Sequence, residues 1–151
     1  DNKYPELSKE WELWFSGKIE KDLLNDEDFW KFEKKMATRA ASGEVINRLA
    51  DAVPNLIGGS ADLAPSNKTY MKNRGDFSKE NRKGSNLHFG VREHAMAAIA
   101  NGMYLHGGLK VFVSTFFVFS DYMKPSMRLS ALMNLPITYV LTHDSIDLCQ
   151  I

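Results

Sequence analysis

The sequence predicts an α/β domain with a mostly parallel sheet and helices on both of its faces. From residue 37 onward, short apolar segments rich in β-branched residues alternate with segments whose apolar positions have helical spacing. This alternation is typical of parallel strands connected by crossover helices. The charges agree with it, because residues 1–36 hold 17 charged side chains, residues 37–86 hold 13 and residues 87–151 hold only 8. A segment with so few charges is expected to be mostly buried.

Length and composition exclude several classes of protein. The 151 residues, 44% hydrophobic and 25% charged, suit one folded domain rather than a disordered chain. The balance of 19 basic and 19 acidic residues predicts neither a nucleic-acid partner nor an acidic membrane partner. No stretch approaches the ~20 apolar residues of a membrane span, and the first residues do not resemble a secretory signal. The single cysteine, Cys149, excludes an internal disulfide and favours a cytoplasmic location, and the four histidines lack zinc-type spacing.

The highly charged segment over residues 1–36 is interpreted as an inter-domain linker that is largely helical, followed by an α/β domain over residues 37–151. Aromatic clusters lie at residues 11–15 and 29–32. They could form a binding site, but packing against a neighbouring domain explains them better. A chain that opens with a linker resembles an excerpt from a longer protein.

The first part of the domain predicts a helix, a strand and a loop. Residues 38–52 have apolar side chains at helical spacing, with Thr38 or Ser42 as the capping residue and a proline after the last turn. Residues 56–57 predict a short strand that runs into two glycines. Residues 64–86 are rich in Asn, Lys and Gly, so we expect a long surface loop there.

The second part of the domain predicts two helices between strands. Residues 92–105 have Ala, Met and Ile on nearly every side, which predicts a helix buried all round. Residues 119–133 predict another helix, in which Pro125 indicates a kink or a restart. The predicted strands of this part lie at residues 87–89, 110–114 and 136–141.

Polar, glycine or aromatic residues follow each predicted strand. The segments are Gly59–Leu63, Gly90–His94, Ser114–Phe119 and Thr142–Ser145. Because the carboxyl ends of parallel strands meet at one edge of a sheet, these segments are expected to lie together, and ligands bind at such edges. The sequence therefore predicts one site along that edge.

Glu93 is the residue of these segments that most directly suggests chemistry. It lies in the first turn of a helix whose next positions are apolar. A carboxylate there that faces water would be stabilised by the helix N-terminus, by ~0.3–1 kcal/mol. A buried carboxyl could instead hold or share a proton with a ligand nitrogen. The local sequence leaves both possibilities open.

Five segments together resemble the pyrimidine-binding domain of transketolases. They are residues 59–67 (Gly-Ser-Ala-Asp-Leu-Ala-Pro-Ser-Asn), 89–94 (Phe-Gly-Val-Arg-Glu-His), 115–122 (Thr-Phe-Phe-Val-Phe-Ser-Asp-Tyr), 128–132 (Arg-Leu-Ser-Ala-Leu) and 142–145 (Thr-His-Asp-Ser). One segment alone would be a weak indication, whereas the ordered set between Ala37 and Ile146 is specific. The resemblance also implies that residues 1–36 connect the family's diphosphate-binding domain to this one.

This resemblance implies the transfer of a two-carbon ketol unit from a ketose phosphate to an aldose phosphate, with thiamine diphosphate and magnesium or calcium. Glu93 matches the family's glutamate that hydrogen-bonds the aminopyrimidine ring and thereby promotes removal of the thiazolium proton. Phe116, Phe119 and Tyr122 match the aromatic pocket around that ring, although core packing would be the better explanation for these residues alone.

Five further residues match the family's binding positions. Leu63 and Asp62 resemble positions beside the cofactor. Arg39, Ser66 and His143 match residues that hold the phosphate of the sugar, a role suited to a guanidinium, a hydroxyl and an imidazole. Considered singly, these three would be read as a surface arginine, a loop turn and a polar strand end.

The resemblance implies that this chain provides half of a site. In the family, the cofactor lies between the pyrimidine domain of one subunit and the diphosphate domain of the other subunit of a homodimer. We therefore expect the metal ligands to lie outside this chain, and we expect the isolated chain to be inactive. The tail at residues 147–151 departs from the family pattern, which continues with Gly-Glu-Asp-Gly-Pro-Thr-His.

Two other functions stay open at this point. Dihydroxyacetone synthase shares much of the glutamate motif, although Arg92-Glu93-His94 together with Phe116 and Phe119 favours a transketolase. A non-catalytic α/β interaction module, whose apolar faces bind another chain, would also explain the few charges of residues 87–151.

Overall fold

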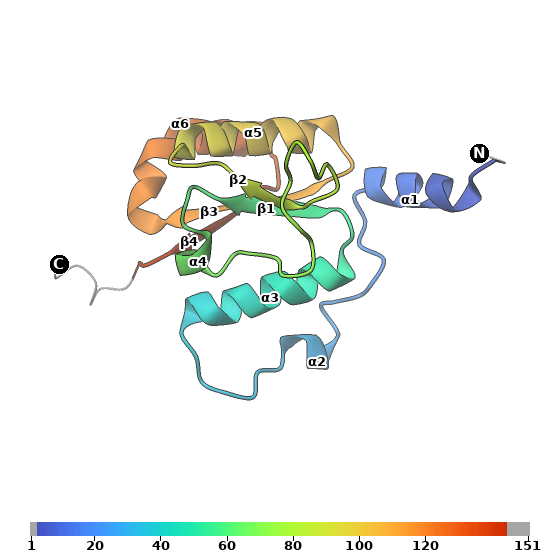
Figure 1. Cartoon of the computed structure of the whole chain (residues 1–151), viewed down its shortest axis with the longest axis horizontal. Helices are drawn as coiled ribbons and strands as arrows, with labels where there is room; N and C mark the ends of the chain where they lie inside the picture. Colours follow the sequence, from blue (N-terminus) through green and yellow to red (C-terminus); the bar gives the residue numbers. More distant parts are fainter. Residues whose placement is uncertain (1–2, 145–151) are drawn as a thin grey trace.

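Four parallel strands form the centre of the structure, a computed structural model that describes residues 3–144 (Figure 1). The elements follow the order α1 (Pro5–Phe15), α2 (Glu27–Trp30), α3 (Thr38–Ala52), β1 (Leu56–Ser60), α4 (Ala64–Asn67), β2 (Asn86–His88), α5 (Glu93–His106), β3 (Lys110–Phe116), a 3-10 turn (Phe117–Phe119), α6 (Ser120–Leu132) and β4 (Thr138–Thr142). No helix among residues 3–144 is long and apolar enough to cross a lipid bilayer.

The strand order is β2-β1-β3-β4, and every neighbouring pair is parallel. Ser60 at the end of β1 lies opposite His88 and Ser114, and Phe116 lies opposite Thr142. The carboxyl ends of all four strands therefore meet at one edge, as predicted. The chain leaves β1 for β2 on one side and returns to β3 on the other, so the switch point where ligands bind in such sheets lies between β1 and β3.

Helices cover both faces of this sheet, with α3 on one face and α5 and α6 on the other (Figure 1). The alternation of side chains along β3 creates a core on each face. Val111 and Val113 pack with Met96 of α5, whereas Phe112 packs with Ile46 of α3. The predicted fold class is confirmed.

The glycines of β1 allow the central strand to lie between its neighbours. A Cβ atom at Gly59 would overlap the carbonyl oxygen of Leu87 in β2, and one at Gly58 would overlap the carbonyl oxygen of Phe112 in β3. These glycines are therefore part of the strand and do not end it. The predicted strand over residues 56–57 was too short for this reason.

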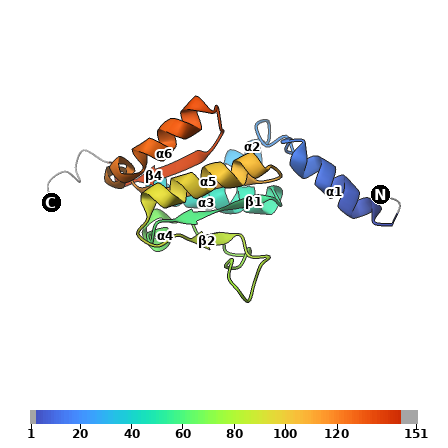
Figure 2. The same cartoon turned by 90° about the horizontal axis from the view of Figure 1, so that it is seen from above.

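The segment before α3 packs on the domain through two aromatic side chains, although α1 itself extends away from the sheet (Figure 2). Phe29 is buried together with Leu23 of the same segment and with Val53, which follows α3. A side chain at either glycine of the turn over residues 107–108 would meet the ring of Phe15, which lies against this turn. Trp11, stacked on Phe15 with ring centroids 4.3 Å apart, remains 64% exposed. The segment is not largely helical as predicted, because among residues 3–36 only the 11 residues of α1 and the 4 residues of α2 are helical. Its role as a linker stays a prediction.

Two predictions about the first part of the domain were wrong. The N-cap of α3 is Ala37 and makes no side-chain capping bond, so neither Thr38 nor Ser42 caps the helix. Residues 64–86 do not form a simple surface loop, because they contain α4 and because Asn67, Thr69 and Met71 are fully buried. The polar side chain of Asn67 is accommodated there by hydrogen bonds to three strands.

Two predictions about the later helices also need correction. Helix α5 is buried on one side only, since Ile99 is 48% and Leu105 is 59% exposed. Helix α6 runs without interruption through Pro125, so the predicted restart does not occur. Pro125 is the sixth residue of α6, where the absent N–H group removes a single hydrogen bond near the start of the helix.

Candidate functional site

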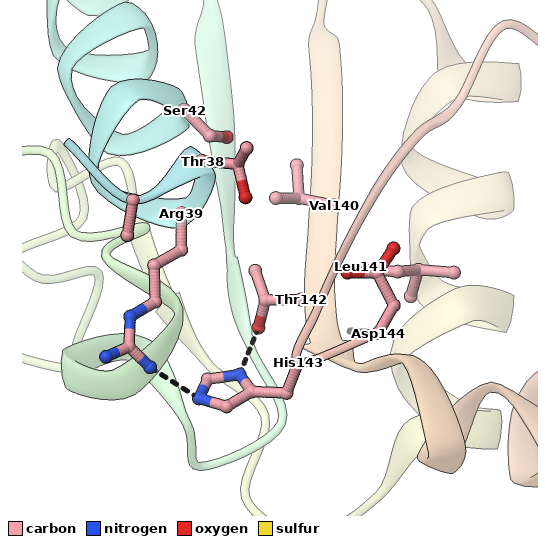
Figure 3. Close-up of a pocket in the computed structure, with 9 residues that line it drawn as sticks. Thr38, Arg39, Ser42, Val140, Leu141, Thr142, His143 and Asp144 are labelled. Atoms are coloured by element: carbon pink, nitrogen blue, oxygen red, sulfur yellow. Dashed lines mark hydrogen bonds between the residues drawn. The ribbon is translucent and has the colours of Figure 1, made fainter. Parts of the chain in front are cut away.

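A cavity of about 600 Å³ lies between the start of α3 and the end of β4 (Figure 3). Its lining consists of Ala37, Thr38, Arg39, Ser42, Val140, Leu141, Thr142, His143 and Asp144. The backbone N–H groups of Thr38 and Arg39, at the start of the first turn, have no partner within a helix, so they favour negative charge at this end of α3. Together with the Arg39 guanidinium, they make the cavity suitable for an anion such as a phosphate group.

Arg39 and His143 meet inside this cavity although 104 positions separate them in the sequence. Nη1 of Arg39 lies 2.7 Å from Nε2 of His143, and Oγ1 of Thr142 lies 2.8 Å from Nδ1 of the same ring (Figure 3). His143 has a φ of 59°, in the left-handed region that non-glycine residues rarely adopt. Such backbone strain is common at binding sites, where the surrounding contacts hold it in place.

The aromatic residues at the end of β3 form a continuous row with this histidine. The ring centroids of Phe116 and His143 are 3.9 Å apart, and those of Phe116 and Phe119 are 5.8 Å apart with nearly parallel planes. Tyr122 extends the row, 6.3 Å from Phe119, and is 66% exposed. The three predicted aromatic residues therefore lie together at the carboxyl edge.

Glu93 begins α5 and is only 8% exposed. Most of the residue is therefore covered by protein, and among residues 3–144 its carboxylate has no hydrogen bond or ion pair. Burying a carboxylate is costly unless a partner compensates for the lost hydration. The geometry therefore suits a proton-holding group that meets its partner outside the described chain, and its catalytic role stays a prediction.

The segment after β1 places the remaining predicted residues at different locations. Asp62 is exposed, has a φ of 61° and lines a second cavity, of about 550 Å³, with Tyr70 and His88. Leu63 is partly buried, and its N–H group donates to Oγ of Ser60 at 3.3 Å. Ser66 is exposed on α4 and does not belong to the lining of the cavity that holds Arg39 and His143.

An ionisable group of three side chains lies beside the second cavity. Nε2 of His88 lies 2.8 Å from Oδ1 of Asp76, and this hydrogen bond holds the pKa of Asp76 below its ordinary value. Partial burial, reinforced by the Asp76 carboxylate, raises the pKa of Tyr70. Within residues 3–144, no cluster of three or more His, Cys, Asp or Glu side chains could hold a metal ion.

A set of buried polar residues that was not identified from the sequence lies beside the cavity between α3 and β4. They are Ser60, Asn67, Ser114 and Thr142, each at most 6% exposed. Asn67 lies inside one of the five segments that resemble the transketolase family, so the sequence carried a signal that this residue belongs to the site. Its partners lie on three different strands, and local sequence cannot predict that they meet.

The comparison with protein families decides the classification. The family described as "Transketolase, pyrimidine binding domain" matches residues 34–150. The chain belongs to this transketolase family. The match continues to residue 150, beyond the Ile146 at which the resemblance was expected to end. The divergent tail at residues 147–151 lies outside the described residues.

Curated transketolases are similar to almost all of the chain. The transketolase of Bacillus subtilis is 56% identical over 143 residues, and that of Geobacillus stearothermophilus is 55% identical over the same length. Each alignment covers 95% of this chain and 21% of the relative. The chain thus spans about a fifth of the length of the curated transketolases it matches.

Solved transketolase structures share the fold. The Pichia stipitis transketolase in complex with sedoheptulose-7-phosphate superposes with a TM-score of 0.87 at 39% identity, over 96% of this chain and 22% of that one. The Campylobacter jejuni transketolase superposes with a TM-score of 0.78 at 41% identity, over 95% of this chain and 21% of that one. The resemblance found in the sequence is therefore confirmed.

Proposed function

We propose that this chain is the pyrimidine-binding part of a complete transketolase. The complete enzyme would transfer a two-carbon ketol unit from a ketose phosphate to an aldose phosphate, using thiamine diphosphate and magnesium or calcium. The main support is the combination of an unpaired, buried Glu93 with the row of aromatic rings at the carboxyl edge. A planar ring with basic nitrogens, such as an aminopyrimidine, fits a buried carboxyl and aromatic side chains.

The chain's own residues would orient the cofactor and place a proton. Thiamine diphosphate supplies the carbanion chemistry when it is bound. Glu93 would hold a proton at the aminopyrimidine ring, while Phe116, Phe119 and Tyr122 would pack around that ring and exclude water. Leu63 and Asp62, from the segment after β1, would lie beside them.

The cavity between α3 and β4 would receive the phosphate end of the sugar. The guanidinium of Arg39 faces it, and the first turn of α3 adds its N–H groups. His143 contacts Arg39 directly. Ser66, which does not line this cavity, would have to reach the substrate from α4 or through another part of the enzyme.

The site is proposed to be completed by a diphosphate-binding domain, from the same enzyme or from a second subunit of a homodimer. Tyr122, Phe117 and Val118 are each more than half exposed at the carboxyl edge, which suits a surface that another domain covers. The metal ligands would lie in that other domain. The single cysteine supports a cytoplasmic location for the enzyme.

Isothermal titration calorimetry tests this proposal. Thiamine diphosphate and magnesium are titrated into this chain, into a transketolase diphosphate-binding domain and into their mixture. We expect a large heat of binding only in the mixture, and a smaller affinity when the chain carries Glu93→Gln. Glu80→Gln, an exposed carboxylate in the segment before β2, is the matched control. No binding in the mixture, with a stable hetero-oligomer, would instead indicate a non-catalytic interaction module.

A further inference from the structure

A buried asparagine connects three strands to the cavity that holds Arg39 and His143. Asn67 is the last residue of α4 and is 0% exposed. Its amide group contacts Oγ of Ser60 at 3.0 Å, Oγ of Ser114 at 2.8 Å and Oγ1 of Thr142 at 2.6 Å. The three hydroxyl groups come from β1, β3 and β4, so Asn67 lies beside the switch point of the sheet.

Backbone carbonyl groups determine the direction of these hydrogen bonds. Oγ of Ser60 lies 3.0 Å from the carbonyl oxygen of Ser114, and Oγ of Ser114 lies 2.8 Å from that of Val140. A carbonyl oxygen only accepts, so each serine directs its single hydroxyl hydrogen to a carbonyl and accepts from the asparagine. The NH₂ group of Asn67 must therefore face the two serines, and Oδ1 must face Thr142.

The direction of these hydrogen bonds also determines where His143 holds its ring hydrogen. Thr142 donates its hydroxyl hydrogen to Oδ1 of Asn67, so its oxygen can only accept from Nδ1 of His143, 2.8 Å away. Nδ1 then has the hydrogen, and Nε2 of the neutral ring is an acceptor. Arg39 is always a donor, and its Nη1 atom lies 2.7 Å from Nε2. The two ends of the network thus require the same tautomer.

We propose that Asn67 is a positioning residue that acts through Thr142: it holds neutral His143 in the Nδ1–H tautomer and directs the Nε2 lone pair at Arg39. This arrangement orients the guanidinium, whose other N–H groups have no partner among residues 3–144 and can bind an anion. Arg39 would donate hydrogen bonds to the anion, and His143 would orient the Arg39 guanidinium. The functional consequence rests on the proposed function, whereas the tautomer itself does not.

Nitrogen-15 NMR of the 151-residue chain tests the tautomer directly. Two-bond proton–nitrogen spectra show which ring nitrogen holds the hydrogen, and they are recorded about two units above the ordinary histidine pKa of ~6.5. We expect the hydrogen on Nδ1 in the unmodified chain and in Thr142→Ser, which keeps the hydroxyl. Thr142→Val keeps the shape but removes the acceptor, so the Nδ1–H tautomer should lose its dominance.

Asn67→Ala gives an independent measurement. Without Oδ1, the Thr142 hydroxyl can donate to Nδ1, so we expect the hydrogen to move to Nε2 and the Arg39 guanidinium, which can no longer donate to that atom, to leave the ring. If Asn67→Ala does not fold, Thr142→Val still tests the proposed tautomer, because valine preserves the packing of a buried β-branched residue. An Nε2–H tautomer in the unmodified chain, or an unchanged Nδ1–H tautomer in Thr142→Val, would overturn the proposal.

Titration of inorganic phosphate into the same samples separates this inference from the proposed function. We expect Thr142→Val to bind phosphate roughly 2- to 12-fold more weakly than the unmodified chain and Thr142→Ser, which corresponds to one hydrogen bond. If the tautomer is as expected and no sample binds phosphate, the phosphate role of the cavity is wrong and the positioning of His143 still stands. If phosphate binds equally well to all three, the role of the network in binding is overturned.

Discussion

At the scale of single residues, two electrostatic situations coexist at the carboxyl edge of the sheet. Glu93 is 8% exposed and has no ion-pair partner within residues 3–144, so a partner for its carboxyl would have to come from another molecule or domain. Arg39 faces a cavity and is oriented by an imidazole 2.7 Å away. A buried, unpaired carboxyl is suited to exchanging a proton with a ligand, and a guanidinium that faces a cavity is suited to binding a phosphate group.

The role proposed for Glu93 predicts the effect of Glu93→Gln in the assembled enzyme. Glutamine keeps the shape but cannot hold a proton, so we expect proton exchange at the thiazolium carbon to slow by about 100-fold or more. Hydrogen–deuterium exchange followed by NMR measures this rate. Glu80→Gln should exchange at the unmodified rate. Undiminished exchange in Glu93→Gln would show that the assignment is wrong.

The pair of Asp76 and His88 predicts a pH dependence. Its hydrogen bond lowers the pKa of Asp76 in the folded chain, so the unfolded chain takes up the proton first as the pH falls. The stabilisation is fully present above the unfolded value of ~3.9 and is lost as the pH falls through the lower folded value. Both side chains are about half exposed, so we expect a small effect. NMR titration of the Asp76 carboxyl checks it, and His88→Ala should raise the titration midpoint toward the ordinary value.

At the scale of secondary-structure elements, β1 determines how closely the other strands approach. It pairs with β2 on one side and β3 on the other, and its glycines leave room for their backbones. The loop after β1 then turns through Asp62 and α4 to bring Asn67 under the edge of the sheet. The site therefore depends on the packing of β1 as well as on the side chains that line it.

Two glycine substitutions test this dependence. Gly59→Ala would place a Cβ atom in the carbonyl group of Leu87, so we expect a loss of about 3 kcal/mol or more in the free energy of unfolding. Gly102→Ala on the exposed side of α5 is the matched control, because its Cβ atom meets nothing within 4 Å. Alanine in a helix should stabilise it by about 0.5–1 kcal/mol. Urea denaturation measures both, and equal effects of the two substitutions would contradict the role of Gly59.

At the scale of the whole molecule, an apolar surface lies on the side of α5 that faces away from the sheet. Ile99 and Leu105 are about half exposed there, and Leu132 of α6 is 66% exposed. Only 8 of the 65 residues from 87 to 151 are charged, so this surface has few charges to keep it in contact with water. Such a surface is typical of a chain that meets another domain or subunit.

The exposed face of α5 predicts the effect of Ile99→Lys on association. A lysine buried at an interface would be unpaired, so we expect the complex with a transketolase diphosphate-binding domain, or the self-association of the chain, to weaken by at least tenfold. Sedimentation equilibrium measures both the complex with that domain and the self-association of the chain. Asn73→Lys, which adds the same charge at an exposed position before β2, should leave association unchanged. Unchanged association in Ile99→Lys would show that this face is not covered.

The sequence by itself determined the fold class, the helix over residues 38–52 and the family, because helical periodicity, β-branched strands and ordered motifs are local properties of the chain. It also located Glu93 and the three aromatic residues, although it left the environment of Glu93 open. Only the tertiary structure decided that Arg39 meets His143, that Asn67 is buried beneath them and that one side of α5 stays exposed. These facts depend on how parallel strands far apart in the sequence are aligned. Periodicity indicates which side of an element is buried, but it does not identify the residue that packs against it.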